Sequence, residues 1–182
     1  MGTLGSAHSS AEFGLVKGVT PKGVHTVIST ASSKPAEEIM QTLVDQQKGR
    51  SVAAPAQLYF LLYISTDRNR AKALIQKVKR AGYKGLWITV DAPVLDLKWI
   101  REEWAGPIVL KGIQSAADAK LAAAYGCQGV LLSNHRGRQS HGSPSSLLTL
   151  LEIRTYYREV LSSIEVFVDG GLRDGADVLK AL

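Results

Sequence analysis

The chain has 182 residues, of which 45% are hydrophobic and 21% charged, a composition typical of a globular protein and not of a disordered one. Lysine and arginine outnumber aspartate and glutamate by 22 to 16. The basic residues are interspersed with acidic ones, so nucleic-acid binding is not expected.

The lack of a signal-peptide pattern and the single cysteine indicate a reducing compartment. No apolar run is long enough for a membrane span, and the N-terminal sequence lacks the basic and apolar regions of a signal peptide. The single cysteine, Cys127, excludes an internal disulfide and provides no zinc-binding cluster. We therefore expect a cytoplasmic or other intracellular protein with no metal site, in which Cys127 is a small core residue.

Apolar runs of strand length alternate with helical patterns from about residue 24 onward. The expected strands cover residues 24–28, 58–64, 85–90, 107–110, 129–132 and 166–168. These runs are apolar throughout, which is typical of parallel strands buried on both faces. Intervening helices predict βα repeats, in either an open doubly wound sheet or a (β/α)8 barrel. No G-x-G-x-x-G motif follows a strand, which counts against a dinucleotide-binding fold.

Capping residues mark the expected helices. Thr66 is expected to cap the helix that follows the second strand, and Ser115 with Asp118 forms a capping box for a later one. A helix that opens near residue 144 is expected to bury Leu147, Leu148 and Leu151.

Polar residues stand at the end of every expected strand. Parallel strands place these ends on one rim, which in a barrel carries the chemistry. The residues are Ser29 and Thr30, Tyr63, Thr89 and Asp91, Lys111, Ser133 to His135, and Asp169.

Two of these strand ends indicate specific chemistry. Asp169, Gly170, Gly171 and Arg173 lead into a helix N-terminus, a pattern that suits either a phosphate site or a tight turn. His135, followed three residues later by Arg138, could pair a general base with a carboxylate clamp, although a single histidine is more often structural. Asp91 could hold that histidine in one tautomer.

Together these motifs resemble the family of FMN-dependent α-hydroxy-acid oxidases and dehydrogenases, which includes glycolate oxidase, lactate oxidase and flavocytochrome b2. The resemblance runs from about residue 26 to 182, and is densest in ISTASSKPAEEI (28–39), TVDAPV (89–94), PIVLKGIQSAADAKLA (107–122), GVLLSNHRGRQ (129–139) and VDGGLRDGADVLKAL (168–182). It implies an incomplete (β/α)8 TIM barrel with about six parallel strands. Residues 1–182 would form one partial barrel domain, in which the pattern leaves residues 1–20 poorly determined.

The resemblance also implies FMN as cofactor and a role for each matching residue. His135 resembles the base that takes a proton from a small L-2-hydroxy acid, and Asp91 the carboxylate paired with it. Tyr63 resembles a catalytic tyrosine that bonds the substrate, and Arg138 the arginine that binds the substrate carboxylate. The implied flavin contacts are Ser29, Thr89, Lys111, Ser133, Asp169, Gly170, Gly171 and Arg173.

The sequence departs from the family at several points. A full barrel needs about 250 residues, and the family's first strand, its eighth strand and the long loop that follows Val94 have no counterpart here. The resemblance therefore implies truncation at both ends and in one internal loop. Leu61 stands where a flavin-binding glutamine is usual, and Arg136 where glycine is usual. The family's second substrate-binding arginine has no counterpart, and Lys98 is not expected to replace its charge.

Two interpretations remain open. The chain is either an FMN-dependent oxidoreductase that converts a small L-2-hydroxy acid to the 2-keto acid, or an inactive truncated remnant or binding module. In the second case its open strand edges would pair across chains in a homo-oligomer. The sequence indicates neither the particular hydroxy acid nor the electron acceptor.

Overall fold

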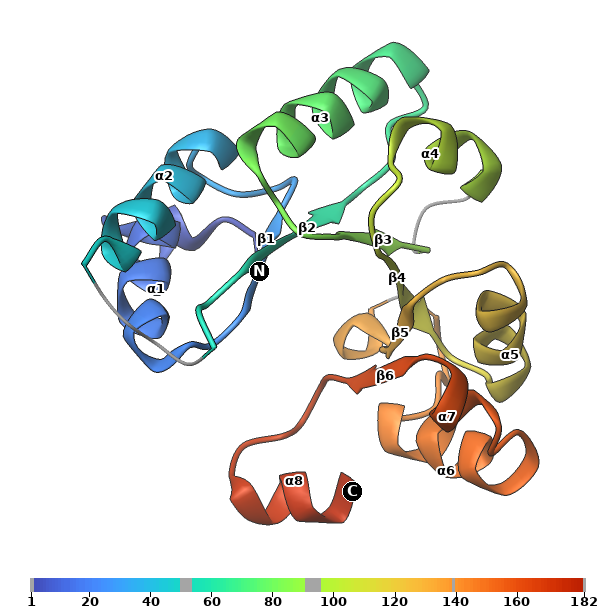
Figure 1. The fold of residues 1–182 in the computed structure, drawn as a ribbon. Helices are drawn as coiled ribbons and strands as arrows, with labels where there is room; N and C mark the ends of the chain where they lie inside the picture. The colour runs from blue at the N-terminus through green and yellow to red at the C-terminus, as the bar shows by residue number, and fades with distance from the viewer. Residues whose placement is uncertain (1, 50–53, 91–95, 139, 182) are drawn as a thin grey trace. The chain divides into compact units, whose positions relative to one another are not determined.

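The computed structural model describes residues 2–49, 54–90, 96–138 and 140–181 (Figure 1). The chain divides into two compact units. Unit 1 comprises residues 1–87 and 96–107, and unit 2 comprises residues 88–95 and 108–182. Within the described ranges, no helix combines the length and the apolar character that crossing a bilayer requires.

Six strands alternate with helices, as predicted. The strands are β1 (Thr26–Ser29), β2 (Leu58–Leu62), β3 (Leu86–Thr89), β4 (Ile108–Ile113), β5 (Gly129–Leu132) and β6 (Glu165–Val168), and they are hydrogen-bonded in chain order. The helices are α1 (Ala11–Val19), α2 (Ala36–Gln47), α3 (Arg68–Ala81), α4 (Leu97–Glu103), α5 (Ala116–Ala124), α6 (Ser146–Tyr156), α7 (Val160–Ser163) and α8 (Gly175–Ala181), with single 3-10 turns η1 (Leu4–Ser6), η2 (Thr20–Lys22) and η3 (His135–Gly137). The N-terminal residues, for which the pattern predicted no element, thus contain η1 and α1.

Unit 1 is built around β1 and β2, which pair in parallel from Thr26 opposite Leu58 to Ser29 opposite Leu61. Helix α3 is capped by Asp67, whose side chain accepts hydrogen bonds from the amides of Asn69 and Arg70 at 2.9 and 3.2 Å. The expected cap, Thr66, was therefore wrong by one residue, because the Asp67 carboxylate is the group that reaches both amides.

Tyr83 links three elements of unit 1. Its ring packs edge-on against Phe60 of β2, with centroids 5.5 Å apart, and its hydroxyl donates to the Ala36 carbonyl oxygen at 2.9 Å. Burial raises the pKa of the Tyr83 phenol well above its usual range, and the nearby Glu37 carboxylate adds to that rise. The buried hydroxyl thus remains a neutral donor that ties the start of α2 to the segment after α3.

Unit 2 contains β4, β5 and β6, with parallel pairs β4–β5 and β5–β6. Every residue of β4 and β5 is buried, as expected for strands covered on both faces. Cys127, just before β5, is 3% exposed, which agrees with its prediction as a core residue. Ser115 caps α5 by accepting the Asp118 amide at 3.1 Å and donating to the Asp118 carboxylate at 2.7 Å, which confirms the predicted cap.

Helix α6 buries a different face from the one predicted. Leu148 and Leu151 are each 58% exposed, whereas Ser146, Thr149 and Ile153 are buried. The two hydroxyls account for this orientation, because Ser146 donates to the Asp169 carbonyl at 2.7 Å and Thr149 to the Gln114 carbonyl at 3.3 Å.

Exposed apolar side chains are concentrated on the helices of unit 2. In addition to the two leucines of α6, they are Leu121 and Tyr125 of α5 and its C-cap, Tyr156 of α6, Leu161 of α7, and Val178 and Leu179 of α8. Among the described residues of unit 1, Val24 and Val44 are the large apolar side chains of this kind.

We expect Tyr83→Phe to lower the free energy of unfolding by about 1 kcal/mol, because the buried Ala36 carbonyl loses its donor. Denaturant unfolding at neutral pH measures this loss. The pKa of Tyr83 is higher in the folded than in the unfolded chain, so its contribution is present below a pH of about 10 and is lost as the pH rises further. The variant should lack that alkaline loss.

Tyr156→Phe is the matched control, because Tyr156 is 71% exposed. The same stability change in both variants would contradict the role assigned to the Tyr83 hydroxyl.

Candidate functional site

Four predicted site residues of unit 2 lie at or near the carboxyl ends of neighbouring strands. Thr89 is the last residue of β3, and the next amide, that of Val90, donates to the Lys111 carbonyl of β4 at 2.8 Å. The Ser133 amide donates to Ile113 at 3.2 Å, and the Asp169 amide to Leu132 at 3.3 Å. These backbone bonds place Thr89, Lys111, Ser133 and Asp169 along one edge of the sheet.

Three residues of this row are polar or charged and yet buried. Thr89, Lys111 and Ser133 are exposed to only 2%, 9% and 1%. Two hydroxyls and an ammonium group are costly to remove from water unless they meet polar partners. A row of such groups at the carboxyl ends of parallel strands is suited to binding a polar ligand.

Lys111 lies inside its strand and not after it. The predicted fourth strand ended at Leu110, but β4 continues to Ile113. The register with β5 shifts between Lys111 and Ile113, and Gly112 has a φ of +102°. This bulge was not predictable from the apolar run, and it changes the direction of the strand next to the buried lysine.

The segment after β5 forms a tight turn around His135. The His135 amide donates to Ser133 Oγ at 3.2 Å, and the Arg138 amide donates to the His135 carbonyl at 3.3 Å. Asn134 Oδ1 accepts the Gly137 amide at 3.0 Å. His135 is half-buried and Arg138 is exposed, so neither residue is enclosed in the core, and their roles as base and clamp stay predictions.

Three successive residues of this turn have left-handed backbone. The φ angles are +51° at His135, +59° at Arg136 and +72° at Gly137. Glycine adopts this conformation without cost, whereas a Cβ makes it unfavourable. Arg136, which replaces a residue expected to be glycine, is thus held in a strained conformation beside His135.

The predicted phosphate segment after β6 is a glycine turn. Gly170 and Gly171 have φ angles of +84° and +83°, a conformation that favours glycine at both positions. The Arg173 amide donates to Asp177 Oδ2 at 3.1 Å, and the Asp177 amide donates to Asp174 Oδ1 at 3.0 Å. Carboxylates of the chain therefore accept hydrogen bonds from two amides that were expected to face an anion. The phosphate site stays a prediction.

Ser29 and Tyr63 lie near each other in unit 1. Ser29 ends β1 and is 3% exposed, and the Tyr63 amide donates to Thr30 Oγ1 at 3.2 Å. Leu61, in place of the expected glutamine, is paired opposite Ser29 and is 6% exposed. The carboxyl ends of β1 and β2 thus carry one buried hydroxyl and one buried apolar side chain.

Asp91 lies outside the described residues, so its pairing with His135 stays a prediction.

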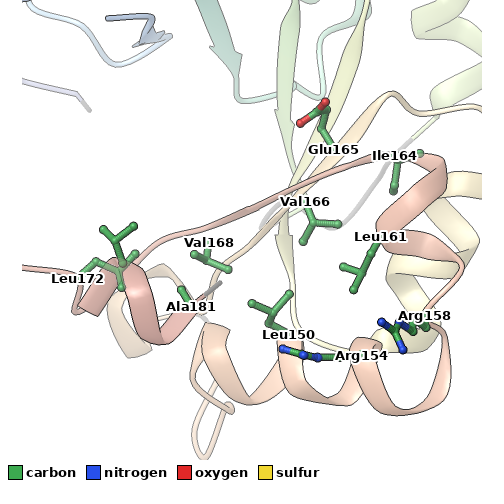
Figure 2. A pocket seen from close by; sticks show the side chains of 11 residues that line it. Leu150, Arg154, Arg158, Leu161, Ile164, Glu165, Val166, Val168, Leu172 and Ala181 are labelled. Atoms are coloured by element: carbon green, nitrogen blue, oxygen red, sulfur yellow. The ribbon is translucent and has the colours of Figure 1, made fainter. Parts of the chain in front are cut away.

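A groove of about 620 Å³ lies in unit 2, and Val168 and Leu172, which line it, are sequence neighbours of the predicted phosphate segment (Figure 2). Its walls are mainly apolar and come from α6, α7, β6 and α8, with Arg154 and Arg158 near one another at one side. None of the residues predicted to bind FMN or substrate lines this groove. The sequence patterns did not predict it.

Comparisons with known proteins identify related chains. The family model described as FMN-dependent dehydrogenase matches residues 1–96 and 94–182. An L-lactate oxidase of Nostoc sp. is 31% identical over 97% of this chain and 60% of its own length. Human 2-hydroxyacid oxidase 1 is 29% identical over 97% of this chain and 59% of its own length.

Solved structures agree with these matches. A crystal structure of mandelate oxidase with 3,3-difluoro-2-hydroxy-3-phenylpropionic acid has a TM-score of 0.85 and 29% identity, covering 100% of this chain and 59% of that one. A mandelate oxidase variant with a monooxide FMN adduct has a TM-score of 0.85 and 30% identity. These matches confirm the predicted fold class, an incomplete (β/α)8 barrel. The chain spans about three fifths of the length of the relatives it matches.

We expect Arg136→Gly to raise the free energy of unfolding by about 1 kcal/mol, because glycine removes the left-handed strain. Thermal or denaturant unfolding measures the gain. Arg136→Ala is the control, since it removes the guanidinium group but retains the Cβ that causes the strain. A gain of the same size in both variants would show that the side chain, and not the backbone, is responsible.

Proposed function

The chain belongs to the FMN-dependent dehydrogenase family, and from this premise we propose that it takes part in the FMN-dependent oxidation of a small L-2-hydroxy acid to the 2-keto acid. The observation that carries the proposal is the row of buried polar residues at successive strand ends of unit 2, beside the turn of His135. Relatives named as lactate and 2-hydroxyacid oxidases support the substrate class.

The residues of the turn suit the handling of a hydroxy acid. Arg138 is exposed, and its guanidinium group can bind a substrate carboxylate through two parallel hydrogen bonds. His135, joined to Arg138 through the backbone of the turn, can accept a proton from the substrate. Tyr63 is proposed to hydrogen-bond the substrate, and Asp91 to stabilise the protonated histidine.

The buried groups suit a flavin. When bound, FMN would accept the two electrons that leave the substrate. Lys111 can neutralise negative charge next to the ring, while the hydroxyls of Ser29, Thr89 and Ser133 can bond its polar edge and ribityl chain. Asp169, Gly170, Gly171 and Arg173 are proposed to contact the ribityl and phosphate end, where the two glycines allow close approach of the backbone.

A non-catalytic role is the second candidate. Leu61 buries an apolar side chain where a flavin-binding amide was expected, and each lost hydrogen bond weakens binding by about 1 kcal/mol. The exposed apolar side chains of unit 2 and the edge strand β6 suit a surface that binds a second copy. Flavin binding distinguishes the two candidates.

We expect the purified protein to bind added FMN, as followed by absorbance, and the bound flavin to bleach under anaerobic conditions with glycolate or L-lactate. His135→Gln should retain the flavin while its reduction slows by about 10²- to 10⁴-fold, because the proton acceptor is lost. Stopped-flow absorbance measures both rates.

His141→Gln is the matched control, because His141 is exposed and lies outside the proposed site. Protein that stays colourless with excess FMN would favour the non-catalytic role. Equal rates in the two variants would remove His135 from the mechanism.

A further inference from the structure

Glu12 is a fully buried carboxylate that the proposed function does not use. It lies in the first turn of α1 and is 0% exposed. Its Oε1 atom accepts the amide of Leu4 at 3.3 Å and the amide of Ser33 at 3.0 Å. Its Oε2 atom is buried and has no hydrogen-bond partner within the described residues. One carboxylate oxygen thus joins two segments that are distant in the sequence.

The two segments are also in direct contact. We call residues 2–6 the N-terminal strap and residues 30–35 the β1–α2 loop. The Thr3 amide donates to the Ala31 carbonyl at 2.8 Å, and the Gly5 amide donates to Ser33 Oγ at 2.9 Å. A Cβ placed on Gly5 would lie 2.8 Å from the Ser33 side chain, so strap and loop are packed as closely as their atoms allow.

The β1–α2 loop in turn determines the orientation of Ser29. The Ala31 amide donates to Ser29 Oγ at 3.1 Å, and the Ser32 amide donates to the Ser29 carbonyl at 3.0 Å. A serine oxygen that accepts a backbone amide has its lone pair directed into the loop, and can donate its own hydrogen elsewhere. The direction of the Ser29 hydroxyl therefore depends on the β1–α2 loop keeping the conformation in which the Ala31 amide donates to Ser29 Oγ.

We propose that Glu12 is a positioning residue: by bonding Leu4 and Ser33 it closes the N-terminal strap onto the β1–α2 loop and so orients the Ser29 hydroxyl toward the flavin. This inference rests on the proposed function, because it assigns a purpose to the orientation of Ser29. Burying a carboxyl group is costly unless it is hydrogen-bonded, and its oxygen suits a position where two backbone amides converge.

The test is a double-mutant cycle on FMN affinity. Ser29→Ala should weaken FMN binding about three- to tenfold, the range for one lost hydrogen bond. Glu12→Ala should weaken it by a similar factor, and the double variant should bind no more weakly than Ser29→Ala alone. A purely structural role for Glu12 would instead give effects that multiply.

Two further variants control for stability. Glu152→Ala is the matched control, because Glu152 also accepts a backbone amide, that of Ala116 at 3.2 Å, but lies in unit 2. It should lower the unfolding temperature and leave the FMN affinity unchanged. Glu12→Asp retains the carboxyl group but is one methylene shorter, and should reproduce the loss of affinity if Glu12→Ala does not fold.

Amide hydrogen exchange tests the inference without a flavin. In Glu12→Asp, the amides of Ala31 and Ser33 should exchange faster than in the unsubstituted protein, whereas Glu152→Ala should leave them unchanged. Unaltered exchange at Ala31 would overturn the inference, whatever the flavin does. The unsubstituted protein could fail to bind FMN while the exchange changes as expected. That result would overturn the proposed function and the purpose assigned to Ser29, but not the role of Glu12 in joining the N-terminal strap to the β1–α2 loop.

Discussion

Parallel pairing of consecutive strands is the constraint on which the candidate site depends. Each strand ends at the same edge as its neighbour, so the residue that follows an apolar run lies beside the residue that follows the next run. In unit 2 this places Thr89, Lys111, Ser133 and Asp169 in one row through backbone hydrogen bonds alone. The residues at the carboxyl ends of the strands can therefore vary while the strands themselves stay apolar and parallel.

The six strands and the start of α5 were predictable, because burial on both faces and capping depend on residues that are close together in the sequence. The Ser115 cap is an example, since both partners lie within one turn. The buried face of α6 was not predictable. Its leucines suggested an apolar face, but the hydroxyls of Ser146 and Thr149 bond carbonyls from distant segments and direct the other face inward.

The residue types of the site could be predicted, whereas their local geometry could not. Lys111 was identified, yet the bulge that follows it depends on its pairing with β5. The carboxylates that accept hydrogen bonds from the amides of Arg173 and Asp177 come from Asp177 of α8 and from Asp174 just before it. No sequence pattern identified Glu12, because its role depends on hydrogen bonds from two backbone amides, one of which is 21 residues further along the chain.

The uneven distribution of exposed apolar side chains has a consequence for how the protein behaves in solution. Unit 1 shields its aliphatic residues well, whereas α5, α6 and α8 present leucines, tyrosines and a valine to water. At high protein concentration, association between molecules should begin at these helices. Polar substitutions at these exposed positions should therefore reduce association while leaving the buried contacts of both units in place.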